Sequence, residues 1–579
     1  MSTTRISHDA PTLTPSPDDL APAHSNDPEL TKESVLRLET MLVEAEAATQ
    51  SEHKLGLWQA LKLYPKASAW SLLISFAVIM EGFDVVLLGS FYAYPEFVRT
   101  FGTQGADGTY QVPARWQAGL SNGANVGAII GLIFVAERFG YRRVMIVALF
   151  YMIGVFFIFF FAKNLQMLLA AEILCGIPWG IFQTLTTSYA SEVAPVVLRG
   201  YLTTWVNACW GIGQLIALGV LRGLLNRTDE WGWRIPYALQ WFWPIPLIVV
   251  AFLAPESPWW LVRKGRIADA RKSLERLTSK SSGVEDFDLD NTISMMAHTN
   301  ELEKEISSGT SYLDCFRGID LRRTEIVCGA WACQQLCGSA FMSYSTYFFQ
   351  QAGLPAESSF DLSMGQYAIN TGGTIIAWFL MASGVGRRTS TECHSTLYLW
   401  GSIWMCAVLL VVGGVSTVNN IAASWAAGVM LLLWSIAYQF TVGTVCFSLT
   451  TELSSRRLLI KTLNLGRGLY CVIGIINGSI MPYMLNPTAW NWKGKTAFFW
   501  AGLDLLVIVW IFFRLPEPSG LTFGEIDKLF EQKVSARKFK KVGIDTFGKD
   551  RARLAVAREA VGVEQVEKDQ PTTAHLENA

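Results

Sequence analysis

Charged residues are scarce in this chain of 579 residues. Asp, Glu, Lys and Arg make up 16% of the sequence, hydrophobic residues make up 51%, and the mean hydropathy is +0.29. These values are too apolar for a water-soluble protein of this length and indicate a protein that crosses the bilayer several times. A formal net charge of −1 gives no electrostatic reason to expect nucleic acid as a partner.

The sequence also lacks the residue groupings of an enzyme active site, a cofactor site or a metal site. It contains no nucleophile with a neighbouring base and no nucleotide-binding loop, so we expect neither catalysis nor a cofactor. Most of the ten cysteines fall in apolar runs, where they behave as small buried residues rather than as a disulfide framework. Cys333 and Cys337 lie one helical turn apart, but no His or further Cys completes a metal site, which favours packing over metal binding.

Both ends of the sequence are polar. Residues 1–65 are rich in Ser, Thr, Pro and acidic residues and contain no apolar segment like that of a cleaved signal peptide. Residues 516–579 are charged and poor in apolar residues. We expect both to be solvent-exposed, partly disordered tails.

Between the tails, twelve apolar runs are long enough to cross a bilayer as helices of about 20 residues. The first six occupy residues 69–94, 117–136, 144–162, 166–190, 201–222 and 235–254. The last six occupy residues 325–349, 362–383, 395–415, 421–447, 463–484 and 496–513. The predicted fold is therefore an all-α membrane protein with two six-helix bundles, residues 66–254 and 323–515. The stretch 255–322 joins them as a hydrophilic linker, in which LVRKGRIADARKSLERL predicts one amphipathic helix.

Basic residues cluster in alternate connections between the predicted spans. The clusters are Arg142 with Arg143, Arg199, Arg263 with Lys264 and Arg266, Arg387 with Arg388, and Arg456 with Arg457 and Lys461. By the positive-inside rule these loops and both termini face the cytoplasm. The sequon at Asn226 then lies on the outer side, where a glycan can be attached.

The two halves repeat one another. FGYRR follows the second span and GVGRR the eighth; SEVAP follows the fourth and TELSSRR the tenth; APESP follows the sixth and LPEPS the twelfth. Two bundles of this kind can flank a central cavity and expose a substrate to each side of the membrane in turn.

These motifs resemble those of the sugar porter branch of the major facilitator superfamily. Within that branch, PESPWWLVRKGR, VCFSLTTEL and LRGYLTTWVNACWGIGQLIA are similar to segments of the fungal α-glucoside (maltose-type) permeases, and the resemblance covers about residues 60–535. It implies a multi-pass plasma-membrane carrier for an α-glucoside or related oligosaccharide, working by alternating access with proton symport. We expect the protein to act as a monomer.

Two other functions remain open at this point. The same fold could carry a glycoside-like or polyol-like metabolite, by facilitated diffusion or as an exporter. It could also serve as a nutrient sensor that no longer transports, although sensors of this fold tend to have longer cytoplasmic tails.

A sugar site needs amide and hydroxyl groups with aromatic faces at mid-membrane depth. By resemblance, Gln334 and Gln335 in the seventh span and Gln214 in the fifth match glutamines that bind sugar hydroxyls in the family. Tyr344 is expected to line the outer path, and Phe447 stands where many hexose porters carry a tryptophan. A buried glutamine can instead bond a neighbouring helix, which is the alternative for each.

Four ionisable residues inside apolar runs form the candidate coupling set: Glu81 and Asp84 in the first span, Glu172 in the fourth and Arg467 in the eleventh. A charged carboxylate at the centre of such a helix costs about 2.5 to 3.5 kcal/mol. Desolvated acids of this kind can take up and release a proton, and Arg467 is the natural counter-ion. The resemblance implies that this set couples transport to protons; a static salt bridge is the alternative.

Two positions depart from the families with proton coupling. The α-glucoside permeases commonly carry a further carboxylate where this chain has Ala128, and proton-coupled hexose porters usually carry an arginine where it has Glu172. Coupling therefore rests on a reduced set of acids or is absent. Asp504, in the twelfth span, matches no motif and is left without a role.

Arginines and acids at the cytoplasmic helix ends are expected to form ion pairs that hold one conformation and break in the other. The predicted gate residues are Arg142, Arg143, Glu192, Arg199, Glu256, Arg387, Arg388, Glu452, Arg456 and Glu517. The alternative is that the arginines only anchor the loops on the cytoplasmic side.

Overall fold

The computed structural model describes residues 57–104, 108–133, 139–279, 311–382, 394–418, 420–455, 458–518 and 523–541, with a few residues between 289 and 300. Most of both polar tails and the middle of the linker lie outside these ranges. The described part is helical except for one short hairpin of antiparallel strands, β1 (Thr103–Gln104) and β2 (Tyr110–Gln111).

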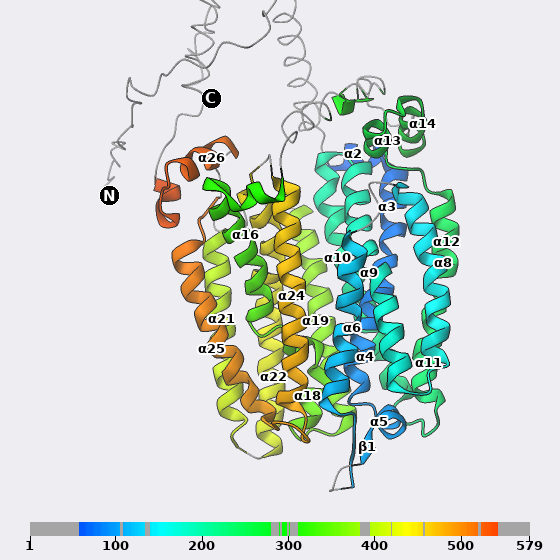
Figure 1. Cartoon of the computed structure of the whole chain (residues 1–579), viewed down its shortest axis with the longest axis vertical. Helices are drawn as coiled ribbons and strands as arrows, with labels where there is room; N and C mark the ends of the chain where they lie inside the picture. Colours follow the sequence, from blue (N-terminus) through cyan, green and yellow to red (C-terminus); the bar gives the residue numbers. More distant parts are fainter. Residues whose placement is uncertain are drawn as a thin grey trace, which may run out of the picture.

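The first bundle holds six spanning segments (Figure 1). The first segment consists of α3 (Pro65–Ser75) and α4 (Ala77–Phe91), and the last of α11 (Trp231–Leu239), a 3-10 turn at Gln240–Phe242 and α12 (Pro244–Leu253). Between them lie α6 (Ala114–Ile133), α8 (Tyr141–Phe160), α9 (Leu165–Val193) and α10 (Val196–Leu224). Short helices α2 (Leu57–Leu63) and α5 (Pro95–Phe101) flank the first span.

The second bundle repeats this arrangement. Its broken segments are the seventh, with α16 (Gly318–Leu336), α17 (Ala340–Ser343) and α18 (Ser345–Gln351), and the tenth, with α22 (Ile421–Tyr438), a π-helical turn at Gln439–Gly443 and α23 (Thr444–Leu453). The others are α19 (Ala356–Ala382), α21 (His394–Val415), α24 (Leu459–Leu485) and α25 (Thr496–Arg514). Figure 1 shows the two bundles side by side, which confirms the predicted twelve-helix fold.

Nine of the described segments are long and apolar enough to cross a membrane by length and composition. The other three are α6, the series α16 to α18, and α19. They carry polar side chains inside the helix, such as Asn122, Gln334 and Asn370, which lower their hydropathy. Both α6 and α19 pack against helices of the other bundle, so their polar residues serve the interface between the bundles rather than the lipid face.

Within the predicted linker, the stretch LVRKGRIADARKSLERL is divided between two helices instead of forming one. The chain forms α13 (Pro258–Arg263) and α14 (Ile267–Leu277), and Gly265 between them has φ 72°. That left-handed backbone conformation ends a helix and favours glycine. Both helices lie at the same end of the molecule as α26 (Phe523–Glu531), here called the linker end, and the β-hairpin marks the opposite hairpin end (Figure 1).

Within the first bundle, α4 and α10 pack with their backbones in contact. A Cβ atom added to Gly213 would overlap the carbonyl oxygen of Ile79, and one added to Gly82 would overlap that of Trp210. Small residues allow this close approach of membrane helices. Because α4 carries Glu81 and Asp84, this packing also fixes where the two acids lie.

Hydrogen bonds join the two bundles toward the hairpin end. The Tyr344 hydroxyl donates to the Ser121 Oγ at 2.7 Å, and the Tyr347 hydroxyl donates to the Gln111 Oε1 at 3.2 Å. The ring of Tyr344 also stacks on Tyr92 of the first bundle, with centroids 6.1 Å apart.

An ion pair reinforces the same junction. Arg222, near the end of α10, places its Nε 2.8 Å from Asp361 Oδ1 and its Nη2 3.5 Å from Glu357 Oε2, both on α19. The bundles are therefore fastened to each other at the hairpin end by aromatic, hydrogen-bond and ionic contacts.

Replacing Gly213 with valine should disrupt the packing of α4 on α10, because overpacking of this kind costs about 1 to 3 kcal/mol or more. We expect a lower Tm and less monodisperse protein after extraction in mild detergent. Gly219→Val is the matched control, since Gly219 lies on the same helix with open space around it. Equal losses in both variants would contradict the packing argument.

Replacing Arg222 with glutamate should loosen the hairpin end, because the new carboxylate would face Asp361. The labelling rate of a Ser121→Cys background by an impermeant maleimide should rise about two- to fivefold, as expected for losing an exposed ion pair. The double change Arg222→Asp with Asp361→Arg should restore slow labelling. Arg227→Glu is the control, because Arg227 pairs with Asp229 in its own loop. If this variant is also labelled faster, the effect is not specific to the ion pair between Arg222 and Asp361.

Candidate functional site

The centre of the molecule holds a chain of three polar side chains that crosses from one bundle to the other. Glu81, on α4, is 4% exposed, and its Oε1 accepts a hydrogen bond from the Nε2 of Gln183 on α9. The Oε1 of Gln183 in turn accepts from the Nη2 of Arg467 on α24 at 2.8 Å. The sequence predicted Arg467 as the counter-ion of an acid, and the structure places an amide between the two charges.

Aromatic rings surround the guanidinium of Arg467. Its central carbon lies 5.1 Å from the centroid of the Trp331 ring and 4.7 Å from that of Tyr470. Both rings belong to the second bundle, and their faces attract a cation away from water. Arg467 is therefore stabilised from its own bundle as well as by Gln183.

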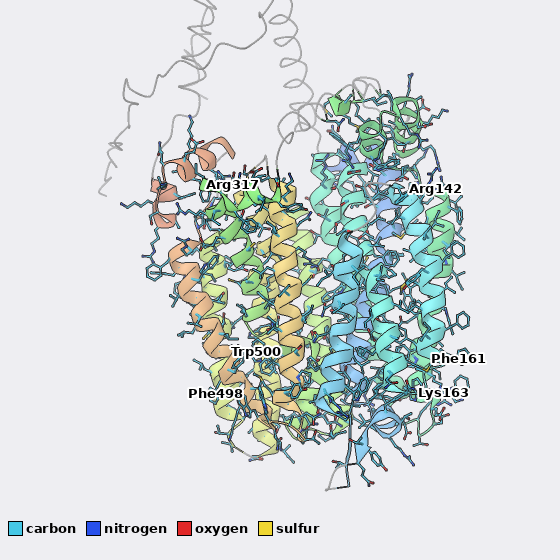
Figure 2. All side chains as sticks on the ribbon, viewed as in Figure 1. Arg142, Phe161, Lys163, Arg317, Phe498 and Trp500 are labelled. Atoms are coloured by element: carbon cyan, nitrogen blue, oxygen red, sulfur yellow. The ribbon has the colours of Figure 1, made fainter. Side chains whose placement is uncertain are left out.

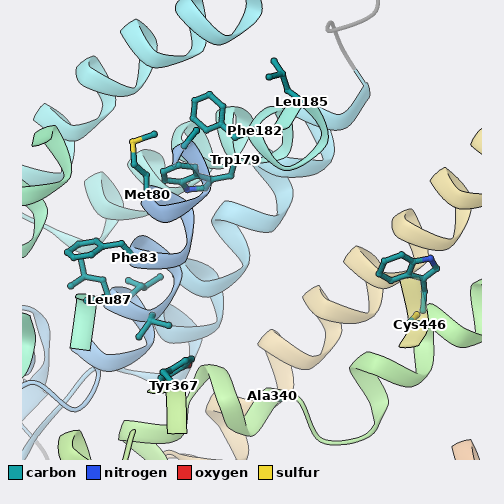
Figure 3. Close-up of a cluster of buried hydrophobic side chains, with 14 of the residues drawn as sticks. Met80, Phe83, Leu87, Trp179, Phe182, Leu185, Ala340, Tyr367 and Cys446 are labelled. Atoms are coloured by element: carbon teal, nitrogen blue, oxygen red, sulfur yellow. The ribbon is translucent and has the colours of Figure 1, made fainter. Parts of the chain in front are cut away.

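Asp84 lies one helical turn beyond Glu81. Its side chain is 2% exposed and has its own set of hydrogen-bond donors. It accepts from the Nε2 of Gln240 at 2.8 Å, the Nε1 of Trp179 at 3.3 Å and the thiol of Cys175 at 3.7 Å. Figure 3 shows Trp179 among apolar side chains of α4 and α9. Donors around a carboxylate in an apolar wall stabilise its charged form. The sequence analysis did not identify these donors.

Glu172 stands apart from the central chain. It lies on α9 about three turns from Gln183, is 1% exposed, and its Oε1 has no hydrogen-bond partner among the residues that the structure describes. It is close enough to Asp84 for their charges to interact. The four predicted coupling residues thus occupy three environments: Glu81 linked to Arg467, Asp84 with donors, and Glu172 alone.

The predicted sugar-binding glutamines have different surroundings. The Nε2 of Gln334 donates to the carbonyls of Val442 at 3.2 Å and Gly443 at 3.0 Å. These carbonyls belong to the π-helical turn, where the regular α-helical pattern is interrupted. The amide protons of Gln334 are therefore engaged with the backbone of its own bundle.

Gln335 faces α24 instead. Its Oε1 accepts from Ser339 Oγ at 3.3 Å and from Asn477 Nδ2 at 3.4 Å. Gln214 is buried on α10, three residues beyond Gly211, where that helix meets Thr371 of α19. Gln214 therefore lies on a helix that packs against the opposite bundle, whereas Gln335 contacts α24 of its own bundle.

The structure adds a residue that the sequence analysis missed. Asn370, on α19, is 6% exposed, and neither atom of its carboxamide has a hydrogen-bond partner in the described part of the chain. The same holds for the Oε1 of Gln366 one turn earlier and for the Oδ1 of Asn122 on α6. Buried amides are costly when unpaired, so they suit a ligand rich in hydroxyl groups. Polar residues inside the apolar run YAINTGG were the available signal.

The structure adds little to the predicted roles of two sugar contacts, Tyr344 and Phe447. Tyr344 is buried and joins the bundles at the hairpin end, as described above. The side chain of Phe447 lies outside the described residues, and so does that of Trp378, another aromatic of the central spans.

At the linker end, the predicted gate acid Glu192 pairs with a residue of the linker. It accepts from Arg263 Nη2 at 2.5 Å, from the hydroxyl of Tyr141 at 2.9 Å and from Ser257. Arg263 had been assigned only to a basic loop. The contact therefore attaches the start of the linker to the first bundle.

Glu256 caps the beginning of α8. It accepts from the backbone N–H groups of Tyr141 at 2.9 Å and Arg142 at 3.3 Å, while the Arg142 guanidinium donates to the carbonyl of Phe252. Burial raises the pKa of the Glu256 carboxyl above its ordinary value, and the backbone donors oppose that rise. Glu256 thus contacts Arg142 through its backbone N–H group; the sequence predicted ion pairs among these arginines and acids in general, without naming a partner for Glu256.

The remaining predicted residues are distributed as follows. Arg143 and Asn226 are exposed, and Glu452 is half-buried. Arg199 donates to the carbonyl of Ala194 at 3.2 Å, and Glu517 accepts from the backbone of Thr396 at 3.4 Å. Arg387, Arg388 and Arg456 lie outside the described residues.

Comparison with known proteins places these features in a family. A family model described as "Sugar (and other) transporter" matches residues 70–530. The general alpha-glucoside permease of Saccharomyces cerevisiae is 38% identical over 537 residues, which cover 92% of this chain and 86% of that protein. Maltose permease MAL61 of the same yeast is 39% identical over 526 residues, covering 90% and 84%.

A solved structure agrees on the fold. The proton:xylose symporter XylE of the major facilitator superfamily superposes with a TM-score of 0.62 at 18% identity, covering 80% of this chain and 99% of that one. Because the curated relatives are permeases, the resemblance and the expectation of a transporter rather than an enzyme are confirmed. The chain belongs to the sugar transporter family and has the fold of a major facilitator superfamily protein.

Proposed function

We propose that this protein carries an α-glucoside or related oligosaccharide into the cell across the plasma membrane, by alternating access coupled to proton symport. The relatives that support the substrate class are named for α-glucosides and maltose. The observation that carries the coupling is the chain from Glu81 through Gln183 to Arg467, because it links a buried carboxyl to the contact between the two bundles.

The linker end faces the cytoplasm in this proposal, and so do both termini. Arg142 and Arg317 lie at that end, whereas Phe161, Lys163 and Phe498 lie toward the opposite one (Figure 2). Asn226, exposed after α10, then faces outward as a glycan acceptor. With this orientation, the contacts of Tyr344 and Arg222 close the outer side.

Sugar binds between the bundles in this mechanism, where amides of both bundles replace the water around its hydroxyl groups. Gln214 comes from the first bundle, and Gln335 and Asn370 come from the second. Gln334 supports the site by holding the π-helical turn, and Phe447 remains a predicted aromatic contact. A ligand that bonds amides from both sides favours closure of the bundles around it.

The proton binds at Glu81, since a neutral carboxyl is far less costly inside a membrane than a charged one. Asp84, with three donors, is the acid best suited to stay ionised. Glu172, with a bare oxygen, is best suited to stay protonated. The protein is proposed to work as a monomer, without a cofactor.

The direct test is transport by purified protein in proteoliposomes, using labelled di- and trisaccharides with simultaneous recording of external pH. We expect sugar-induced alkalinisation outside and loss of accumulation with a protonophore. Glu81→Gln should retain sugar exchange but lose accumulation, because the amide cannot carry the proton. Glu96→Gln, in the short helix α5 outside the spans, is the control. Accumulation that survives the protonophore would eliminate proton symport, and transport of none of these sugars would eliminate the substrate class.

A facilitative carrier is the second candidate, and Ala128 is the observation that favours it. Ala128 lies on α6 where the backbone touches Gly180 of α9, and it offers no carboxyl where the related permeases commonly have one. Ala128→Glu should raise the proton flux per sugar if the native coupling is weak. It should also lower stability, because a buried charge costs about 2.5 to 3.5 kcal/mol. Ala128→Gln, of equal size, should leave proton flux unchanged; a gain in that variant would show that size rather than charge is responsible.

A further inference from the structure

Gln183 uses both ends of its side-chain amide across the interface between the bundles. Its nitrogen donates to Glu81 within the first bundle, and its oxygen accepts from Arg467 of the second at 2.8 Å. Among the described contacts, the acid and the arginine share no direct hydrogen bond or ion pair, so the amide is the hydrogen-bonded link between them. We propose that Gln183 is a positioning residue that makes separation of the two bundles at this point depend on protonation of Glu81. The inference rests on the proton symport proposed above.

The chemistry of the three groups gives the link a direction. An ionised carboxylate only accepts hydrogen bonds, a guanidinium only donates them, and an amide does one at each end. With Glu81 ionised, a single orientation of the Gln183 amide satisfies both neighbours, and it is the orientation observed. The bonds at both ends then involve a charged partner and are the stronger for it.

A proton taken up from water by Glu81 weakens this arrangement. If the new O–H group faces Gln183, it meets the amide nitrogen, and the amide must rotate to offer its oxygen. The nitrogen would then face Arg467, donor against donor, and the bond to the second bundle is lost. If the proton sits on the Oε2 of Glu81, which has no partner among the described residues, the Oε1 becomes a neutral acceptor and its bond weakens.

The surroundings of Glu81 are consistent with this role. The charged groups near it are Asp84 on its own helix and Arg467 on α24. The thiols of Cys175 on α9 and Cys471 on α24 also lie near enough to interact with it. From α10, the backbone of Trp210 packs on Gly82 beside it. Protonation of Glu81 therefore removes a negative charge that faces a cation of the other bundle.

Arg467 does not need Gln183 in order to remain buried. The rings of Trp331 and Tyr470 hold its guanidinium from within the second bundle. When the bond to Gln183 breaks, the cation can move away with its own aromatic neighbours. A hydrogen bond through a neutral amide is also easier to break than a direct buried ion pair, because loss of the latter leaves an uncompensated charge.

The test compares Gln183→Met, which has similar length but no hydrogen bonds, with the wild-type protein in proteoliposomes and by spin-label distances. Labels at the exposed residues Thr228 and Ala489 report separation of the bundles at the hairpin end. In the wild type we expect acidification to shift molecules toward longer distances. In Gln183→Met the distribution should no longer change with pH, and the number of protons moved per sugar should fall severalfold while sugar exchange persists.

Two further variants serve as controls for this test. Gln439→Met removes another partly buried glutamine, one that bonds Thr374 within the second bundle, and should retain the pH response of the wild type. Gln183→Asn keeps an amide that is too short to reach both neighbours and should behave as Gln183→Met does. It replaces that variant if the methionine protein does not fold.

The outcomes separate this inference from the proposed function. A wild-type protein that moves sugar without protons would contradict the symport proposal. The role of Gln183 would then be tested only by whether the spin-label distances change with pH. A pH response and a proton-to-sugar ratio in Gln183→Met equal to those of the wild type would overturn the inference while leaving symport intact.

Discussion

A charge inside a membrane must find its partners within the protein, because lipid offers none. In this protein Gln183 of the first bundle contacts both Glu81 and Arg467, and its bond to Arg467 of the second bundle requires the two bundles to be together. In the mechanism we propose, the position of one bundle relative to the other depends on the protonation of this single buried carboxyl. The other contacts of the molecule, within each bundle and between the two, allow the bundles to move relative to each other.

Each bundle is tightly packed and carries its own part of the linker end. In the first, Gly82 and Gly213 allow α4 and α10 to touch backbone to backbone, and Glu192 holds Arg263 at the start of the linker. In the second, Arg514 pairs with Glu325, and α26 lies against the same bundle, where the Phe530 ring meets the guanidinium of Arg323. Contacts kept within a bundle let it move as a rigid body.

The contacts between the bundles are of another kind. At the hairpin end they are hydrogen bonds of tyrosine hydroxyls and the exposed ion pair of Arg222 with Asp361, each weak enough to break in turn. Deeper in the interface, α19 packs against α10 and carries Asn370, whose amide has no hydrogen-bond partner among the described residues. In the proposed mechanism this amide gains partners when sugar binds. In the proposed mechanism, sugar and proton therefore act on the same interface, which is the physical requirement for coupling.

The twelve helices, their grouping into two halves, the family and the buried acids could all be predicted from the amino-acid sequence. These features follow from local hydropathy and from motifs of consecutive residues, which need no knowledge of the fold. Three contacts emerged from the folded structure alone: Gln183 lies between Glu81 and Arg467, Gln334 supports a π-helical turn, and Glu192 meets Arg263. Partners more than seventy residues apart in the chain, on helices whose rotation depends on packing, are chosen by three-dimensional proximity. No local pattern in the sequence shows which of several buried polar side chains will be close enough to form a contact.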